Sequence, residues 1–280
     1  MLVTLKDVLK DAKRNKYAVG LFNTVSLEMA KGVIAAAEET KSPVIVGTAE
    51  VLLPYAGLEE LAYFLIPMAK KAKVPVVVHF DHGMTPELII KSMALGFSSV
   101  MYDCSTETYE KNISNCAEMH RIARLFGASV EAELGHVGAA AGAAEEDGGE
   151  GVYTEPEQAK AFAERTGVDA LAVAIGTAHG EYKVKPELDI RRLREIADIT
   201  AVPLVLHGGS GLSDEDFKNC ISSGISKINI FTDINMAAAG AAAQSYKKGC
   251  GMTDLLCSIT NGVKKAAIEK MELFGCTDRY

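Results

Sequence analysis

The sequence predicts an α/β protein of the (β/α)₈ barrel (TIM barrel) class, with one domain over residues 1–280 and a helical C-terminal extension. Short apolar segments rich in Val and Ile recur along the chain, and helix-like stretches separate them. Several of these segments are continuously apolar, which is typical of strands covered on both faces. The even repetition over about 250 residues favours a closed barrel over an open, doubly wound sheet.

The expected strands cover residues 17–25, 43–49, 75–81, 99–104, 129–135, 170–176, 203–209 and 225–233. Between them, "SLEMAKGVIAAAEETK" begins with a serine cap, and "TPELIIKSMALG" begins with Thr-Pro and ends with Gly. Both patterns are typical of helix boundaries. "EPEQAKAFAERTG" and "SDEDFKNCISSG" repeat the pattern, and the tail from Ala237 is expected to be helical and to pack outside the barrel.

Composition limits the partners and the compartment. The net charge of −8 argues against non-specific nucleic-acid binding, which needs Lys and Arg to neutralise phosphates, but it does not exclude a small anionic substrate. None of the six cysteines forms a C-x-x-C pair, the N-terminus lacks an apolar signal segment, and no apolar run is long enough to span a bilayer. We therefore expect a soluble, cytoplasmic protein with reduced cysteines and no membrane partner.

Residues 136–154, "HVGAAAGAAEEDGGEGVYT", interrupt the alternation after the fifth expected strand. The segment is rich in Gly and Ala and has an acidic centre. It is either a surface loop without a role or a lid that delivers a carboxylate, from Glu145 or Glu146. A long loop on the active rim of a barrel favours the second interpretation.

Polar residues follow the expected strands at their carboxyl ends, where barrels of this type place their chemistry. These residues are Asp81, His82, Asp103, Glu133, His179, Gly180, His207, Gly208, Gly209, Ser210, Asn229, Thr232 and Asp233. A lone histidine is more often a structural residue, but His82, His179 and His207 gather on one rim. Three imidazoles with one open position are the arrangement of a catalytic Zn²⁺, which can polarise a carbonyl.

The other three histidines give weaker signals. His79 is in step with Asp81 and out of step with His82 along the strand, so we predict a buried supporting residue. His120 lies in a helical stretch and is expected to be structural. For His136, at the border of the loop, both interpretations stay open.

The segment "HGGSG" after the seventh strand is either a simple glycine turn or a phosphate site made of backbone N–H groups and the Ser210 hydroxyl. A metal beside a phosphate site indicates retro-aldol cleavage of a ketose phosphate through an enediolate. Asp81 would move the proton of the cleaved hydroxyl, and Glu145 or Glu146 would act at the enediolate carbon. No lysine ends the sixth strand, so the sequence gives no support there for a Schiff base.

Seven motifs resemble, in family order, those of the zinc-dependent class II fructose-bisphosphate/tagatose-bisphosphate aldolase family, from Tyr17 to Asp233. They are "YAVGLFN", "SPVIVGTAE", "HFDHG", "VEAELGHVG", "LAVAIGTAHG", "PLVLHGGSGL" and "KINIFTD". The resemblance implies that Asp81 is the acid–base residue and that His82, His179 and His207 bind zinc. It implies that Asp103 and Glu133 serve alternative or second metal binding.

The resemblance also implies substrate contacts and assembly. Gly180, Gly208, Gly209 and Ser210 match the phosphate segment, which in this family also holds a monovalent cation, Na⁺ or K⁺. Asn229 and Thr232 match residues that contact the dihydroxyacetone phosphate half, and Asp233 and Thr48 are further candidate substrate contacts. The family's loop glutamate matches Glu145 or Glu146. Family members form homodimers or homotetramers.

Departures from the family pattern concern the distal phosphate. Phe231 replaces an asparagine, Asn235 stands where an arginine is common, and Thr48 replaces a serine. Other segments are similar to the tagatose-bisphosphate and sugar-acid-phosphate branch. We therefore hypothesise a ketose 1-phosphate aldolase, with a ketose 1,6-bisphosphate substrate still open. The alternatives are a fructose-1,6-bisphosphate aldolase proper, a metal-dependent sugar-phosphate epimerase or isomerase, and a non-catalytic barrel that stabilises a partner aldolase.

Overall fold

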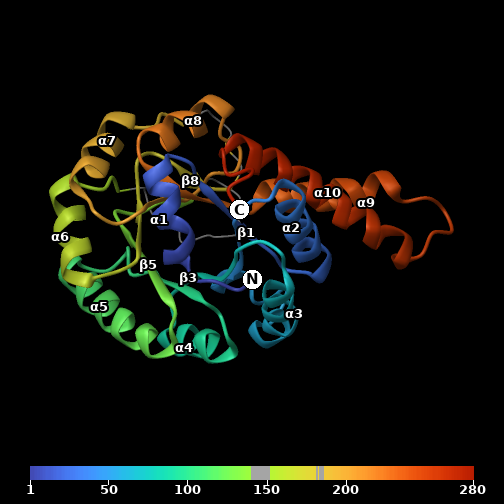
Figure 1. Cartoon of the computed structure of the whole chain (residues 1–280), viewed down its shortest axis with the longest axis horizontal. Coiled ribbons are helices and arrows are strands. Elements are labelled where there is room, and N and C mark those ends of the chain that lie inside the picture. The colour runs from blue at the N-terminus through green and yellow to red at the C-terminus, as the bar shows by residue number, and fades with distance from the viewer. Residues whose placement is uncertain (140–151, 181, 183–185) are drawn as a thin grey trace.

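The computed structural model describes residues 1–139, 152–180, 182 and 186–280. Eight parallel strands close into a barrel in the order β1-β10-β9-β7-β5-β4-β3-β2, which confirms the predicted fold class (Figure 1). The barrel strands are β1 (Val19–Asn23), β2 (Val44–Ala49), β3 (Val76–Gly83), β4 (Ser99–Tyr102), β5 (Ser129–Leu134), β7 (Ala170–Val173), β9 (Leu204–Leu206) and β10 (Ile225–Ile230). Each lies within or overlaps one expected strand.

Helices surround the barrel and cover the outer faces of its strands (Figure 1). They are α2 (Leu27–Thr40), α3 (Leu58–Lys71), α4 (Pro86–Leu95), α5 (Tyr109–Phe126), α6 (Pro156–Thr166), α7 (Ile190–Ile199) and α8 (Asp214–Ser222). Helix α1 (Leu5–Asn15) precedes the first strand, and a short 3₁₀ turn, η1 (Glu50–Leu52), follows β2. The predicted helix boundaries are confirmed for α2 and α4, whose ends carry recognisable capping residues. The Ser26 hydroxyl accepts from the Met29 N–H, and Gly96 ends α4 at φ +105°.

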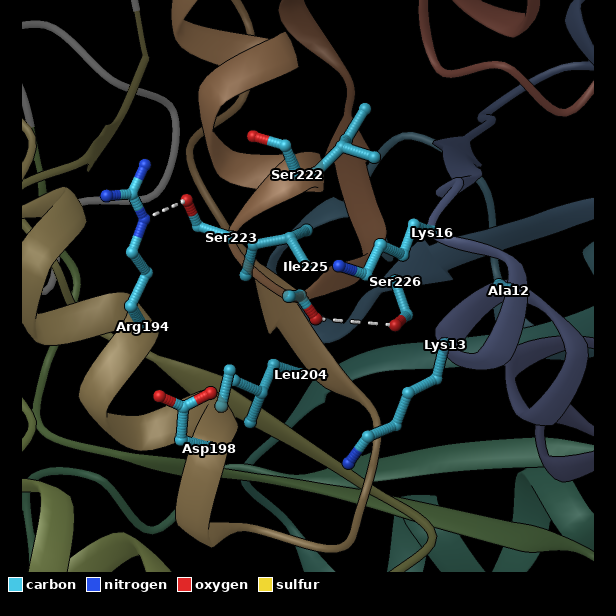
Figure 2. Close-up of a pocket in the computed structure, with 13 residues that line it drawn as sticks. Ala12, Lys13, Lys16, Arg194, Asp198, Leu204, Ser222, Ser223, Ile225 and Ser226 are labelled. Carbon is cyan, nitrogen blue, oxygen red and sulfur yellow. Dashed lines mark hydrogen bonds between the residues drawn. The ribbon is translucent and has the colours of Figure 1, made fainter.

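Helix α1 closes the amino end of the barrel (Figure 1). The Lys13 ammonium donates to the carbonyls of Thr200, Ala201 and Val202 at 2.7, 2.7 and 3.0 Å, just before β9. A cavity of about 340 Å³ lies beside it, between α1, α7 and the segment that enters β10 (Figure 2). Its polar lining includes Lys16 and Arg194.

The C-terminal extension forms two further helices, α9 (Thr232–Ser245) and α10 (Met252–Leu273), which project from the barrel (Figure 1). The second half of α10 packs on α2. A Cβ at Gly32 of α2 would lie 2.8 Å from Val263 Cβ and 2.7 Å from the Thr260 carbonyl oxygen, so glycine permits this close approach. The extension therefore returns to the barrel through the part of α10 that begins near Thr260.

Two local features differ from the prediction. A small parallel pair, β6 (Gly138–Ala139) with β8 (Ala178–His179), joins the segments that follow β5 and β7. Helix α9 begins at Thr232, earlier than the expected start near Ala237, because the chain turns into the helix directly after β10 ends. No helix in the described part of the chain is long and apolar enough to cross a membrane.

Candidate active site and metal centre

Strand β3 delivers two adjacent side chains to the barrel interior, although strand geometry places neighbours on opposite faces. Backbone conformation explains this. His82 has φ +41°, a left-handed value rare for residues other than glycine, and the pairing of β3 with β4 shifts register between Phe80 and Gly83. As a result Asp81 contacts asparagines from β1 and β10, while His82 reaches a histidine that follows β9.

The chain is also anchored where it leaves β3. The Glu50 carboxylate, from η1, accepts hydrogen bonds from the backbone N–H groups of Met84 and Thr85 at 2.8 and 3.0 Å. The Thr85 hydroxyl donates to the same carboxylate at 2.5 Å. Glu50 therefore holds the turn between the "HFDHG" segment and α4.

His82, His179 and His207 converge from β3, β8 and the end of β9, and their candidate ligand nitrogens lie within 4.8 Å of one another. His82 Nε2 and His207 Nδ1 are 2.7 Å apart. The His82 and His179 rings meet edge to face with centroids 4.9 Å apart. The structure therefore brings the three predicted ligands together.

The outer nitrogens of two of these rings face carboxylates. His82 Nδ1 is 2.7 Å from Asp103 Oδ2, and His207 Nε2 is 2.8 Å from Glu131 Oε1. A carboxylate only accepts, so each ring directs an N–H to its carboxylate. The inner nitrogens, His82 Nε2 and His207 Nδ1, then face one another, and a metal bound there would take both as ligands. Carboxylates behind metal-ligating histidines are the usual second layer of a zinc site.

Burial and the neighbouring His82 lower the pKa of His207, and burial together with the other two imidazoles lowers the pKa of His179 well below its usual value. Both rings are therefore neutral near pH 7 and can offer lone pairs to a metal. This electrostatic state fits a divalent cation better than it fits a cluster of imidazolium ions.

The carboxylates of the site do not share one protonation state. Burial by itself would raise the pKa of Asp81, Asp103 and Glu131. Nearby imidazoles outweigh burial and lower all three pKa values, and the Lys227 ammonium adds to the lowering at Asp81 and Glu131. The pKa of Glu131 falls to about 2. Burial and the Asp103 charge raise the pKa of Glu133 well above its usual value. Ionised carboxylates therefore gather beside the histidines, and a divalent cation bound there would offset part of their negative charge.

Three buried side chains surround the Asp81 carboxylate. Asn23 Nδ2 donates to Oδ2 at 2.8 Å, and Asn229 Nδ2 lies 3.1 Å from both oxygens. His79 Nε2 is 3.6 Å from Oδ1, while its Nδ1 is 2.8 Å from the Ser99 hydroxyl. His79 is thus buried beside Asp81, at the supporting position that the strand alternation predicts.

The "HGGSG" segment curls against the segment after β7. Gly208 has φ +65°, and a Cβ there would collide with the Ala178 carbonyl, so the close approach requires glycine. Ser210 Oγ accepts from the Asp233 N–H at 3.4 Å, in the first turn of α9. Backbone N–H groups at a helix start beside glycines form a recognised anion site.

The residues of this rim match a known family. The family model described as "Fructose-bisphosphate aldolase class-II" matches residues 3–279. The chain belongs to the class II fructose-bisphosphate aldolase family. It is therefore a class II aldolase, a carbon–carbon lyase of a metal-dependent family, and the resemblance inferred from the motifs is confirmed.

Individual relatives agree along the whole chain. The aldolase is 42% identical over 275 residues to the uncharacterized protein YdjI of Escherichia coli K12, covering 98% of each chain. It is 38% identical to a fructose-bisphosphate aldolase of Thermus caldophilus, covering 100% of both. The crystal structure of the E. coli YdjI aldolase superposes with a TM-score of 0.90 at 39% identity, covering 100% of this chain and 99% of that one.

Among the remaining predicted site residues of the aldolase, Thr48 and Asp233 lie within the described residues. Glu145 and Glu146 are outside the described residues. On β2, Thr48 pairs with Phe80 of β3, and the next residue, Ala49, pairs with Asp81. Because side chains alternate along a strand, Thr48 and Ala49 point to opposite faces of β2. Asp233 Oδ2 is 2.7 Å from the Lys270 ammonium of α10.

The remaining predicted residues occupy varied places. Asp103 and Glu133 lie with His82 in a second candidate metal group. Gly180 follows β8 at φ +95°, and Thr232 begins α9. His120 lies on α5, and its Nε2 is 3.9 Å from Oδ2 of Asp169, which directly precedes β7. His136 Nδ1 is 3.1 Å from the Ser105 hydroxyl.

Sequence reasoning missed several residues of the aldolase's site. Glu131, Lys227 and Asn23 lie within the expected strands 129–135, 225–233 and 17–25, and the sequence pattern gives them no role in the site. A signal was present, because Glu131 alternates with Glu133 and Lys227 alternates with Asn229, each pair two residues apart within a buried strand.

Tyr182 was also missed. Its hydroxyl donates to the Gly208 carbonyl at 2.7 Å and accepts from the Ala178 N–H at 2.9 Å. It therefore ties the segment that carries His179 to the glycine segment after β9. Nothing in its sequence position indicated this contact.

Proposed function

We propose that this aldolase reversibly cleaves a ketose phosphate to dihydroxyacetone phosphate and an aldehyde, with Zn²⁺ as its metal. The observation that carries the proposal is the convergence of three histidines, two of them backed by carboxylates, next to the buried Asp81 carboxylate. Three nitrogen ligands with an open position are typical of catalytic zinc.

Each proposed role follows from a contact. His82, His179 and His207 would hold the metal, with Asp103 and Glu133 as the alternative or second metal position. A divalent ion there supplies Lewis-acid polarisation of a substrate carbonyl. Asp81 is ionised and oriented by Asn23 and Asn229, so it is prepared to take the proton of the cleaved hydroxyl. Glu145 or Glu146 is proposed to act at the enediolate carbon.

Phosphate would bind at the glycine segment. Gly180, Gly208, Gly209 and Ser210 offer backbone N–H groups and a hydroxyl, and Thr232 stands at the start of α9, where the helix dipole favours an anion. Asn229 would contact the dihydroxyacetone phosphate half, and a monovalent cation, Na⁺ or K⁺, would accompany the phosphate. Asp233 and Thr48 stay proposed substrate contacts, with Thr48 level with Phe80 on β2.

For the substrate we propose a ketose 1-phosphate, because the exposed Asn235 offers no positive charge to a distal phosphate where an arginine is common in the family. Two relatives are named fructose-bisphosphate aldolase, and these names favour the alternative substrate, fructose 1,6-bisphosphate. The test measures kcat/KM for fructose 1,6-bisphosphate, tagatose 1,6-bisphosphate and fructose 1-phosphate. A strong preference for either bisphosphate would contradict the single-phosphate proposal.

The same assay tests the metal. We expect chelation by EDTA to abolish cleavage and stoichiometric Zn²⁺ to restore it. Full activity of the protein after its metal content has been measured as zero would refute the metal role. Products that conserve the carbon number of the substrate would indicate an epimerase instead.

We propose a cytoplasmic location and self-association as a homodimer or homotetramer. All six cysteines are free in the structure, as expected in a reducing compartment. Residues 235–262 of the projecting helices contain no buried residue, and residues 234–246 contain no charged one. A second copy of this acidic chain is the partner we expect on an uncharged surface, since repulsion between copies is weakest there.

Sedimentation equilibrium of the parent and of Met236→Lys tests the association. Met236 is 64% exposed on α9, so the lysine leaves the monomer fold intact but places a charge in the contact. We expect the parent to be oligomeric and the variant to have a larger dissociation constant, so that it is already dissociated at concentrations at which the parent is still associated. A monomeric parent, or a variant with unchanged association, would contradict this surface.

A further inference from the structure

Lys227 is a lysine inside the barrel whose role the proposed chemistry does not include. It lies in the middle of β10, and its side chain is 0% exposed. Its ammonium nitrogen lies 2.9 and 3.1 Å from the two oxygens of Glu131 and 2.6 Å from Asn229 Oδ1. Burying such a pair adds little stability over a well-packed apolar pair, so stability alone does not explain it.

The first branch of contacts runs from Lys227 to Asp81. An ammonium group only donates, so the amide of Asn229 must turn its oxygen toward Lys227. Its nitrogen then faces the Asp81 carboxylate, 3.1 Å from each oxygen. Lys227 therefore selects the one orientation of Asn229 in which the amide donates to Asp81.

The second branch runs from Lys227 to His207. Glu131 Oε1 accepts from His207 Nε2 at 2.8 Å, and the adjacent ammonium compensates the buried carboxylate charge. This contact holds the His207 proton on Nε2 and leaves Nδ1 facing His82. One buried charge thus orients groups on both sides of the site.

We propose that Lys227 is a positioning residue for the cleavage reaction, which acts through Asn229 on Asp81 and through Glu131 on His207. The inference rests on the roles proposed above for Asp81 and His207. It assigns to the Lys227–Glu131 pair a function in alignment, without contact to the substrate.

The decisive variant is the double substitution Lys227→Met/Glu131→Gln, because it removes both charges of the buried pair together and leaves neither partner without the other. Lys227→Met alone is measured beside it. Lys13→Met is the matched control, since Lys13 is also bound to fixed oxygens, but at the amino end of the barrel. Each purified, zinc-loaded protein is assayed for kcat, KM, zinc affinity and thermal unfolding.

We expect the double variant to fold, to lower kcat by about 100-fold with KM changed little, and to weaken zinc binding by about 10-fold. The Lys13→Met control should keep the parent's kcat and zinc affinity. A kcat of the double variant within about threefold of the parent would overturn the inference. So would failure of the double variant to fold, because the pair would then be a structural requirement.

A second measurement separates positioning from general damage. If Lys227 acts through Asn229, the double substitution should cost much less in kcat when it is made in an Asn229→Ala background. Purely additive losses would overturn the Asn229 branch. If the parent itself cleaves no ketose phosphate, the proposed function fails. The zinc affinities of parent and variants still report on the Glu131 branch in that case.

Discussion

The two ends of the barrel both hold a lysine beside fixed oxygen atoms, yet they use it differently. Behind the site at the carboxyl end, Lys227, from the middle of β10, is fully buried and pairs with Glu131 and Asn229. At the amino end, Lys13 donates to three backbone carbonyls beside an open cavity (Figure 2). Lys227 pairs with groups that orient reacting side chains, whereas the hydrogen bonds of Lys13 fix main-chain carbonyls.

The difference shows where this aldolase concentrates buried charge. Carboxylates, imidazoles and an ammonium meet inside the carboxyl end, where each would be costly to bury alone. The amino end closes with main-chain hydrogen bonds and partly exposed side chains. In barrels of this class the carboxyl rim serves chemistry and the opposite face serves stability, and the following predictions test that division.

The largest effect is expected from Asp81→Asn. Asparagine fills the same volume but cannot accept a proton, so kcat should fall by about 10³-fold. Zinc content should stay stoichiometric, because Asp81 is not among the three histidines that would hold the metal. The matched control is Asp198→Asn, an exposed aspartate at the amino-end cavity, which should keep the parent's kcat. Loss of zinc in Asp81→Asn would reassign Asp81 to a structural role.

An intermediate effect is expected from Tyr182→Phe. Without the hydroxyl, the Gly208 carbonyl and the Ala178 N–H lose their bridge, so the phosphate segment and His179 are held less firmly. We expect KM to rise by about 10-fold with a smaller change in kcat. Steady-state kinetics of parent and variant decide this, and an unchanged KM would contradict the bridging role.

The same variant should alter stability in alkali. Burial raises the pKa of Tyr182 to about 12, above its value of about 10 in an unfolded chain. The folded state then retains the proton longer, so the stability from this group is complete below about pH 10 and is lost toward pH 12. Denaturant titrations should show the advantage of the parent over Tyr182→Phe shrinking across this range. A constant difference would contradict the shift.

The smallest effect on activity is expected from Lys13→Met at the amino end. The substitution removes three hydrogen bonds to carbonyls near the start of β9, and the free energy of unfolding should fall by about 1–3 kcal/mol. Chemical denaturation measures the loss, and kcat should equal that of the parent. A drop in kcat without a loss of stability would break the contrast between the two ends.

Much of the architecture could be predicted from the pattern of apolar segments. Each expected strand matches a barrel strand, because a strand buried on both faces needs a run of Val and Ile that few other structures tolerate. The start of α9 and the small β6–β8 pair escaped prediction. The start of α9 depends on where β10 stops. The β6–β8 pair depends on two segments that meet only after the barrel closes.

The amino-acid sequence by itself determined the barrel, the family and the three histidines, since residue type and position at strand ends are local properties. Only the tertiary structure decided that Asp81 and His82 share the interior, through the left-handed backbone at His82. It also joined Lys227, Glu131 and Asn229 into one network and set Thr48 level with Phe80. These outcomes depend on backbone angles and on register between strands far apart in sequence, and neither is encoded in a short stretch of residues.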